Sequence, residues 1–112
     1  MDNIILNHPL VLEEAQRTPD GAGGYTEAWV QLGTLWAQIK AGSGSETQDG
    51  GISLSRTSFR ITVRAAPYGA PSRPRPEHRF RNGTRIFRIL SVAEHDTGAR
   101  YLTCVAIEEV VV

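Results

Sequence analysis

The sequence predicts an all-β fold: a small antiparallel β-barrel or sandwich of about six strands, with one long flexible loop. Three observations support this prediction. Apolar and polar residues alternate with a period of two over several short runs, which is typical of strands with one buried face. Clusters of Gly, Pro, Asn and Asp separate these runs and predict turns. Eleven Gly and six Pro in 112 residues interrupt the chain too often for long helices.

The first two expected strands form a hairpin. Residues 8–17 (HPLVLEEAQR) place Leu10 and Leu12 on one face, residues 18–24 form a turn, and residues 25–40 form the second strand. Gly33 divides this second strand and predicts a bend or bulge there. A helix over residues 27–41 is the alternative, which Gly33 and Thr34 in the middle of the run disfavour.

The clearest strand covers residues 56–66 (RTSFRITVRAA), where Phe59, Ile61 and Val63 alternate with polar residues. The Pro-rich segment 67–77 predicts an extended, non-helical connection. Residues 78–81 form a short strand, Asn82-Gly83 marks a tight turn, and residues 85–94 and 100–110 form two further strands joined by a turn. Both faces of the last strand are partly apolar, so we expect it to be well buried.

The chain is expected to fold as a single domain over residues 8–110. Residues 41–55 (AGSGSETQDGGISLS) are poor in apolar residues and rich in Gly and Ser, which predicts a flexible loop within that domain. Loops of this length inside a compact domain are usually functional or disordered. A passive surface loop is the alternative.

Charge is sorted along a chain that is neutral overall, with 12 basic and 12 acidic residues. Residues 56–88 hold nine arginines against Glu77 alone, whereas residues 1–50 hold Arg17 and Lys40 against seven acidic residues. This segregation predicts contact with a polyanion, or contact between the acidic and basic faces of two copies. Guanidinium groups suit either partner because they bind phosphates and carboxylates through two hydrogen bonds. An ordinary solvated strand face is the alternative.

No arrangement of residues predicts an enzyme, a metal site or a cofactor. His8, His78 and His95 lie far apart and lack metal-ligand spacing with Cys104 or a carboxylate. Cys104 has apolar neighbours and is expected to be a buried small hydrophobe. No run approaches the roughly 18 apolar residues that span a membrane, and Met1 is not followed by the basic region of a signal peptide.

Sequence-specific reading of DNA bases is not expected either. No recognition helix is evident, and aromatic residues are not interleaved with the arginines as they are in base-stacking surfaces. Trp29 and Trp36 lie outside the arginine block, and we expect them to pack in the core or between subunits.

The motifs, in their order along the chain, resemble a known family. They are Gly24 with Trp29, Trp36-Ala37-Gln38-Ile39 with Gly44 and Glu46, the strand Phe59–Arg64, Arg79 with Gly83, Phe87–Val92, Asp96 and Tyr101-Leu102. The chain resembles the phage head–tail joining proteins, also called head-closure, stopper or head–tail adaptor proteins, of long-tailed phages and gene transfer agents. The resemblance covers residues 8–110 and departs from the family pattern at the Pro-rich segment 67–76 and the compact loop 41–55.

This resemblance implies a structural virion protein, not an enzyme, made in the bacterial cytoplasm and located at the head–tail interface of a virion or gene-transfer-agent particle. Such a protein forms a ring between the portal or adaptor complex and the tail, extends and closes the DNA channel, and docks the tail. The implied partners are further copies of itself, the portal or adaptor ring, the tail terminator or tail tube, and packaged double-stranded DNA bound non-specifically. No cofactor and no membrane are implied.

The resemblance and the charge pattern together indicate three groups of candidate residues. Candidates for the ring interface or DNA channel are Arg56, Arg60, Arg64, Glu13 and Glu27. Candidates for a gating or partner loop are Ser43, Gly44, Ser45, Glu46, Thr47, Gln48, Asp49, Gly50 and Gly51. Candidates for a docking loop are Arg73 and Arg75.

Two other functions remain open from the sequence. A freestanding nucleic-acid-binding β-barrel fits the arginine block, although the acidic first half would repel the same polymer. A tail-completion or tail-terminator ring protein fits the fold and composition equally well.

Overall fold

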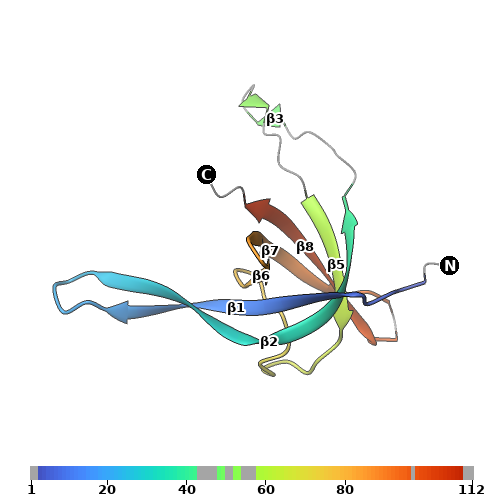
Figure 1. The fold of residues 1–112 in the computed structure, drawn as a ribbon, viewed down its shortest axis with the longest axis horizontal. Coiled ribbons are helices and arrows are strands. Elements are labelled where there is room, and N and C mark those ends of the chain that lie inside the picture. The colour runs from blue at the N-terminus through green and yellow to red at the C-terminus, as the bar shows by residue number, and fades with distance from the viewer. Residues whose placement is uncertain (1–2, 43–47, 50–51, 54–57, 97, 110–112) are drawn as a thin grey trace.

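The computed structural model describes residues 3–42, 48–49, 52–53, 58–96 and 98–109. Within these residues, six antiparallel strands close into a barrel in the order β1-β2-β5-β8-β7-β6 (Figure 1). The strands are β1 (His8–Pro19), β2 (Tyr25–Ala41), β5 (Ser58–Arg64), β6 (Arg79–Asn82), β7 (Arg85–Glu94) and β8 (Tyr101–Glu109). Two short strands, β3 (Gln48–Asp49) and β4 (Ile52–Ser53), pair with each other outside the barrel. The predicted all-β fold class is confirmed.

The barrel encloses one apolar core, to which every barrel strand contributes alternate residues. Leu10 and Leu12 of β1 are fully buried, as the alternation predicted. Phe59 meets Phe87 edge to face with ring centroids 5.2 Å apart. The remaining buried apolar residues are Ala37, Ile61, Val63, Phe80, Ile89, Leu102, Cys104 and Ala106.

A bulge lies in the β1–β2 hairpin beside Gly33. Leu12 pairs with Gly33 and Glu13 pairs with Gln31, so Leu32 is an extra residue on β2. Gly33 has a φ of 152°, a conformation that residues with a side chain rarely adopt. The predicted bend at Gly33 is confirmed, and the alternative helix over residues 27–41 is wrong.

The tight turn between β6 and β7 lies one residue later than the sequence predicts. Asn82 pairs with Arg85, so Gly83 and Thr84 form the turn, and Gly83 has a φ of 61°. In the described part of the chain, no helix is long and apolar enough to cross a membrane.

Candidate functional site

Three basic side chains lie together on the outer surface of the barrel, and we call them the basic row: Lys40, Arg60 and Arg64. Ile61 and Val63 point into the core, so Arg60 and Arg64 of β5 point outward. Lys40 of β2 lies directly opposite Arg60 in the strand register, and all three side chains are exposed. Among the described residues, no carboxylate lies within ion-pair distance of any of them.

Like charges in opposite positions of an antiparallel pair destabilise a sheet. The pairing of Lys40 with Arg60 therefore carries a small penalty in the isolated chain. An anionic partner on this surface would relieve that penalty. Arg56, the third arginine expected in this row, lies outside the described residues.

Glu13 is bound inside its own chain. Its side chain is only 5% exposed, and it accepts hydrogen bonds from Arg79 Nε at 2.7 Å and from Arg81 Nε at 3.1 Å. Burial alone would raise the pKa of Glu13, but the hydrogen bonds and charges of the two arginines outweigh it and hold the pKa below its ordinary value. The guanidinium of Arg79 also stacks on the Trp29 ring at 4.0 Å.

This cluster corrects one interpretation of the sequence. Glu13 was expected to be available to an arginine of a neighbouring copy. In the single chain its two oxygens accept hydrogen bonds from Arg79 and Arg81 across the β1–β6 pair, and its side chain is buried. Two of the nine arginines of the basic block are thus held by one carboxylate, which offsets one of their two positive charges.

Arg85 and Glu108 form a second internal pair, between β7 and β8. Two hydrogen bonds of 2.8 and 3.0 Å join the guanidinium to the carboxylate. The hydrogen bond from Arg85 lowers the pKa of Glu108. The charge of Arg85 is therefore neutralised within its own chain by Glu108.

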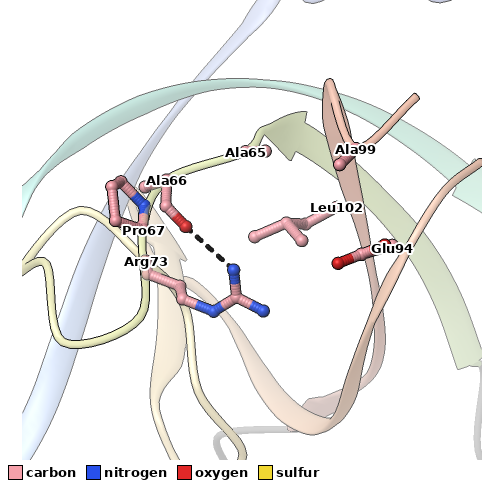
Figure 2. A pocket seen from close by; sticks show the side chains of 7 residues that line it. All are labelled: Ala65, Ala66, Pro67, Arg73, Glu94, Ala99 and Leu102. Carbon is pink, nitrogen blue, oxygen red and sulfur yellow. Dashed lines mark hydrogen bonds between the residues drawn. The ribbon is translucent and has the colours of Figure 1, made fainter. Parts of the chain in front are cut away.

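Arg73 ties the Pro-rich segment to the residues that directly follow β5. Arg73 Nη1 donates a hydrogen bond of 2.8 Å to the Ala66 carbonyl, and its guanidinium stacks at 3.8 Å on the ring of Tyr68, which is 83% exposed. Figure 2 shows Arg73 at one side of a shallow pocket, with Leu102 and Glu94 across from it. Arg75, the other expected docking residue, is exposed and does not take part in the stack.

The expected gating loop falls mostly outside the described residues. Of residues 43–51, only Gln48 and Asp49 of β3 are described. The two ends of the loop meet at its base, where Gly42 N donates a hydrogen bond of 2.7 Å to Ser58 O. A Cβ at position 42 would lie 2.5 Å from Ser58 Oγ, so only glycine fits this neck without a shift.

The β1–β2 hairpin extends beyond the barrel, a feature that sequence reasoning missed. We call residues 15–29 the arm. Its five strand pairs, from Ala15–Trp29 to Pro19–Tyr25, have no neighbour in the barrel, because β6 pairs with β1 only at residues 11–13 and β5 pairs with β2 only at residues 37–41. Figure 1 shows the arm projecting away from the other strands. Glu27, a candidate ring-interface residue, lies on it beside Arg17 at 3.6 Å.

His78 and Cys104 are buried and do not belong to the basic row, the arm or the Tyr68–Arg73 stack. His78 is nearly buried, and its Nδ1 accepts a hydrogen bond from Arg75 N at 3.2 Å. Burial lowers the pKa of His78, and nearby Glu14 only partly offsets this effect. Burial raises the pKa of Cys104 to about 12. The described residues contain no group of three or more metal-ligating side chains.

The structure is thus that of a small all-β protein with an exposed basic row, a projecting arm and a stacked loop on its surface. The chain belongs to the family of phage head completion proteins, whose sequence profile matches residues 1–110. It is similar at 55% identity, with a TM-score of 0.81, to a chain in the virion of a native gene transfer agent particle, covering 98% of this chain and 100% of that one. The resemblance to phage and gene-transfer-agent proteins is thereby confirmed.

Another solved structure shows the same fold. It is a solution structure of a protein from Shigella flexneri 2a, with 21% identity, a TM-score of 0.68 and 96% of each chain covered. No curated protein matches the chain. The family is one of structural virion proteins, so the chain is a structural component of a phage-type or gene-transfer-agent particle.

Proposed function

We propose that copies of this chain form a ring at the head–tail interface, where they extend and close the DNA channel and provide a docking surface for the tail. The partners in this proposal are the portal or adaptor ring on one side, the tail terminator or tube on the other, and packaged DNA in the channel. Residues 8–110 act in it as one structural unit.

The basic row is the observation that carries this proposal. Glu13 binds Arg79 and Arg81 and offsets one of their two charges, Glu108 binds Arg85, and Arg73 is held by the Pro-rich segment. Lys40, Arg60 and Arg64 have no such partner among the described residues, so their charge is available to an external anion. DNA phosphates and the acidic groups of a neighbouring copy both meet this requirement.

A ring of identical subunits uses a heterologous contact, in which one surface of each copy meets a different surface of the next. The segregation of charge suits this geometry. Glu27 is the acidic candidate that remains after Glu13 is assigned to its own chain, because its side chain is 47% exposed and its contact with Arg17 is long at 3.6 Å.

The loop of residues 43–51 is the proposed gating or partner segment. The neck between Gly42 and Ser58 supports this role, since it fixes where the loop leaves the barrel. Removing residues 43–51 should therefore leave the barrel folded. We expect such particles to leak DNA or to lack tails, whereas normal infectious or transducing particles would refute a role for the loop.

The Tyr68–Arg73 stack is the proposed docking loop, together with Arg75. An exposed aromatic ring held by a guanidinium is a rigid contact surface and loses little conformational entropy when a partner binds. This surface lies on a different segment from the basic row, so the two are expected to serve different neighbours.

The experiment that tests the proposal is replacement of the basic row in assembled particles. We expect Arg60→Glu and the double variant Arg60→Gln/Arg64→Gln to reduce nuclease-protected DNA in purified particles. Arg88→Gln is the matched control, because it removes an exposed arginine of β7 that belongs to none of the candidate groups. Full DNA retention in both basic-row variants would overturn the proposal.

A distinct outcome would support the freestanding nucleic-acid-binding alternative. In that case the purified monomer would bind DNA with a steep salt dependence, and particles lacking the chain would still retain DNA and carry tails.

A further inference from the structure

The arm has the physical character of an interaction element that is incomplete in a single chain. A two-stranded ribbon is at best marginally stable in water unless it packs against something else. Here nearly all of residues 15–28 are exposed, and the outer edges of both arm strands carry unpaired backbone groups. The radius of gyration, 15.5 Å, exceeds the roughly 13 Å expected for a compact chain of this length.

The tip of the arm is preorganised. Asp20 Oδ1 accepts hydrogen bonds from Ala22 N at 2.8 Å and from Gly24 N at 3.0 Å, and Asp20 N donates to Gly24 O at 3.0 Å. Gly21 and Gly23 have φ values of 81° and 86°, which this turn needs. A tip that is already ordered loses little entropy on binding.

The two faces of the arm differ. Cross-strand pairs point to the same side, so Ala15–Trp29, Arg17–Glu27 and Pro19–Tyr25 share one face. The opposite face carries the pairs Gln16–Ala28 and Thr18–Thr26. Tyr25 is 69% exposed at the end of the first face, and tyrosine is among the residues most often found to dominate binding energy at interfaces.

A groove with matching chemistry lies on the barrel. Leu6, Leu35 and Trp36 form its apolar walls, and Arg64 lies at its rim. Its volume is about 250 Å³, and Trp36 is 57% exposed beside it. The arm carries Asp20 at its tip and Glu27 beside Arg17, a net charge of −1, whereas the groove continues into the basic row at Arg64, so the two surfaces have opposite charge.

The arm cannot fill the groove of its own chain. Tyr25 and Trp36 are both on β2, and an extended strand separates them by about 35 Å at its usual rise per residue. Filling the groove therefore requires a second copy. A contact from the arm of one copy to the groove of the next is heterologous, and such contacts form a ring when the rotation between copies closes.

We propose that the arm of each copy docks on the next copy of this chain, with Tyr25 inserted beside Trp36 and the acidic tip against Arg64. This inference rests on the proposed ring and names the contact that holds it together. The test must distinguish this contact from one in which a different virion protein occupies the groove.

Photo-crosslinking in assembled particles provides the test. A benzophenone amino acid at position 25 retains an aromatic side chain, and position 26 on the opposite face of the arm is the matched control. We expect ultraviolet light to produce multimers of this chain from position 25, with the crosslink mapping to peptides that contain Trp36 or Arg64, and fewer from position 26. A crosslink from position 25 to a different protein, or no crosslink in particles that contain the chain, overturns the proposal.

Disulfide crosslinking between introduced cysteines provides a second test of the same contact. Cys104 is buried, so a thiol introduced at the surface is the only accessible one among the described residues. Copies with Tyr25→Cys and Trp36→Cys together should give a ladder of oligomers on oxidation. A mixture of the two single variants should stop at dimers. Disulfide-linked dimers from either single variant alone would contradict the arm-to-groove geometry.

Failure of this inference can be distinguished from failure of the proposed function. If the chain lies at the head–tail interface but position 25 contacts something else, the ring stands and the arm contact is wrong. If the chain is absent from that interface, the proposed function itself fails.

Discussion

Arg79 donates a hydrogen bond of 2.7 Å to Glu13, which lies 66 residues earlier in the chain. The pair joins β6 to β1 just where the hairpin leaves the barrel and the arm begins. Arg79 also covers Trp29, the arm residue of β2 nearest the barrel, so a single guanidinium links the barrel to both strands of the hairpin. The Glu13 cluster is therefore expected to fix the direction in which the arm projects.

Removing the Glu13 carboxylate should strongly destabilise the barrel. Glu13→Ala leaves two arginines without their partner, and breaking a buried ion pair in this way costs about 3–5 kcal/mol. We expect a loss near the lower end of that range, because Arg81 is 32% exposed. Urea unfolding of the purified chain measures it. Glu27→Gln is the control and should cost less than about 0.5 kcal/mol, since its ion pair is exposed. Equal losses in both variants would contradict this assignment.

The same cluster predicts how stability depends on pH. The pKa of Glu13 is lower in the folded chain than its ordinary value of 4.5, so the folded state favours the ionised carboxylate. Its contribution is complete above pH 4.5 and is lost as the pH falls below that value toward the folded pKa. We expect the difference in unfolding free energy between the wild type and Glu13→Gln to shrink over this acid range. A difference that stays constant down to pH 3 would count against the ionised pair.

Cys104 should be unreactive in the native barrel. Its side chain is fully buried, and the pKa of the thiol is raised to about 12, so almost no thiolate exists near neutral pH. A chromogenic disulfide reagent should therefore label the native chain only as fast as the barrel opens, and label it quickly in denaturant. Stoichiometric labelling within the mixing time, without denaturant, would show that β8 is not buried as described.

The neck of the long loop should not tolerate a side chain at position 42. Gly42→Ala places a Cβ 2.5 Å from Ser58 Oγ and 3.1 Å from Ser58 O, and we expect a loss of about 1–2 kcal/mol from this overpacking. The double variant Gly42→Ala/Ser58→Ala removes the closer contact and should recover part of that loss. Thermal unfolding of both variants and of Ser58→Ala checks the result. If the Gly42→Ala chain were as stable as the wild type, position 42 would have room for a side chain and the close contact with Ser58 would be wrong.

The fold could be predicted from the sequence where local pattern decides the structure. Alternation placed Leu10, Ile61 and Leu102 in the core because the side-chain period of a strand is two. Gly33 marked the bulge because its backbone conformation excludes other residues. Closure of the barrel through the β1–β6 pair was not predictable in the same way, since that pairing spans about 70 residues.

The candidate surfaces were predicted less completely, for a physical reason. Whether an arginine is free or neutralised depends on contacts between distant strands, so the sequence could not separate Arg60 from Arg79 within one basic block. The arm was recognised as a hairpin but not as a projection. Residues 15–29 alternate as any strand pair does, and nothing local shows that their outer edges lack neighbours.

A reconstruction of the head–tail vertex of a particle that carries this chain tests the central claim most directly. The predicted result is a closed ring of copies around the DNA channel between the portal or adaptor and the tail, with the basic row facing the channel or the adjoining copy. A map that places the chain elsewhere in the particle, or with Arg60 and Arg64 turned to open solvent, would contradict it.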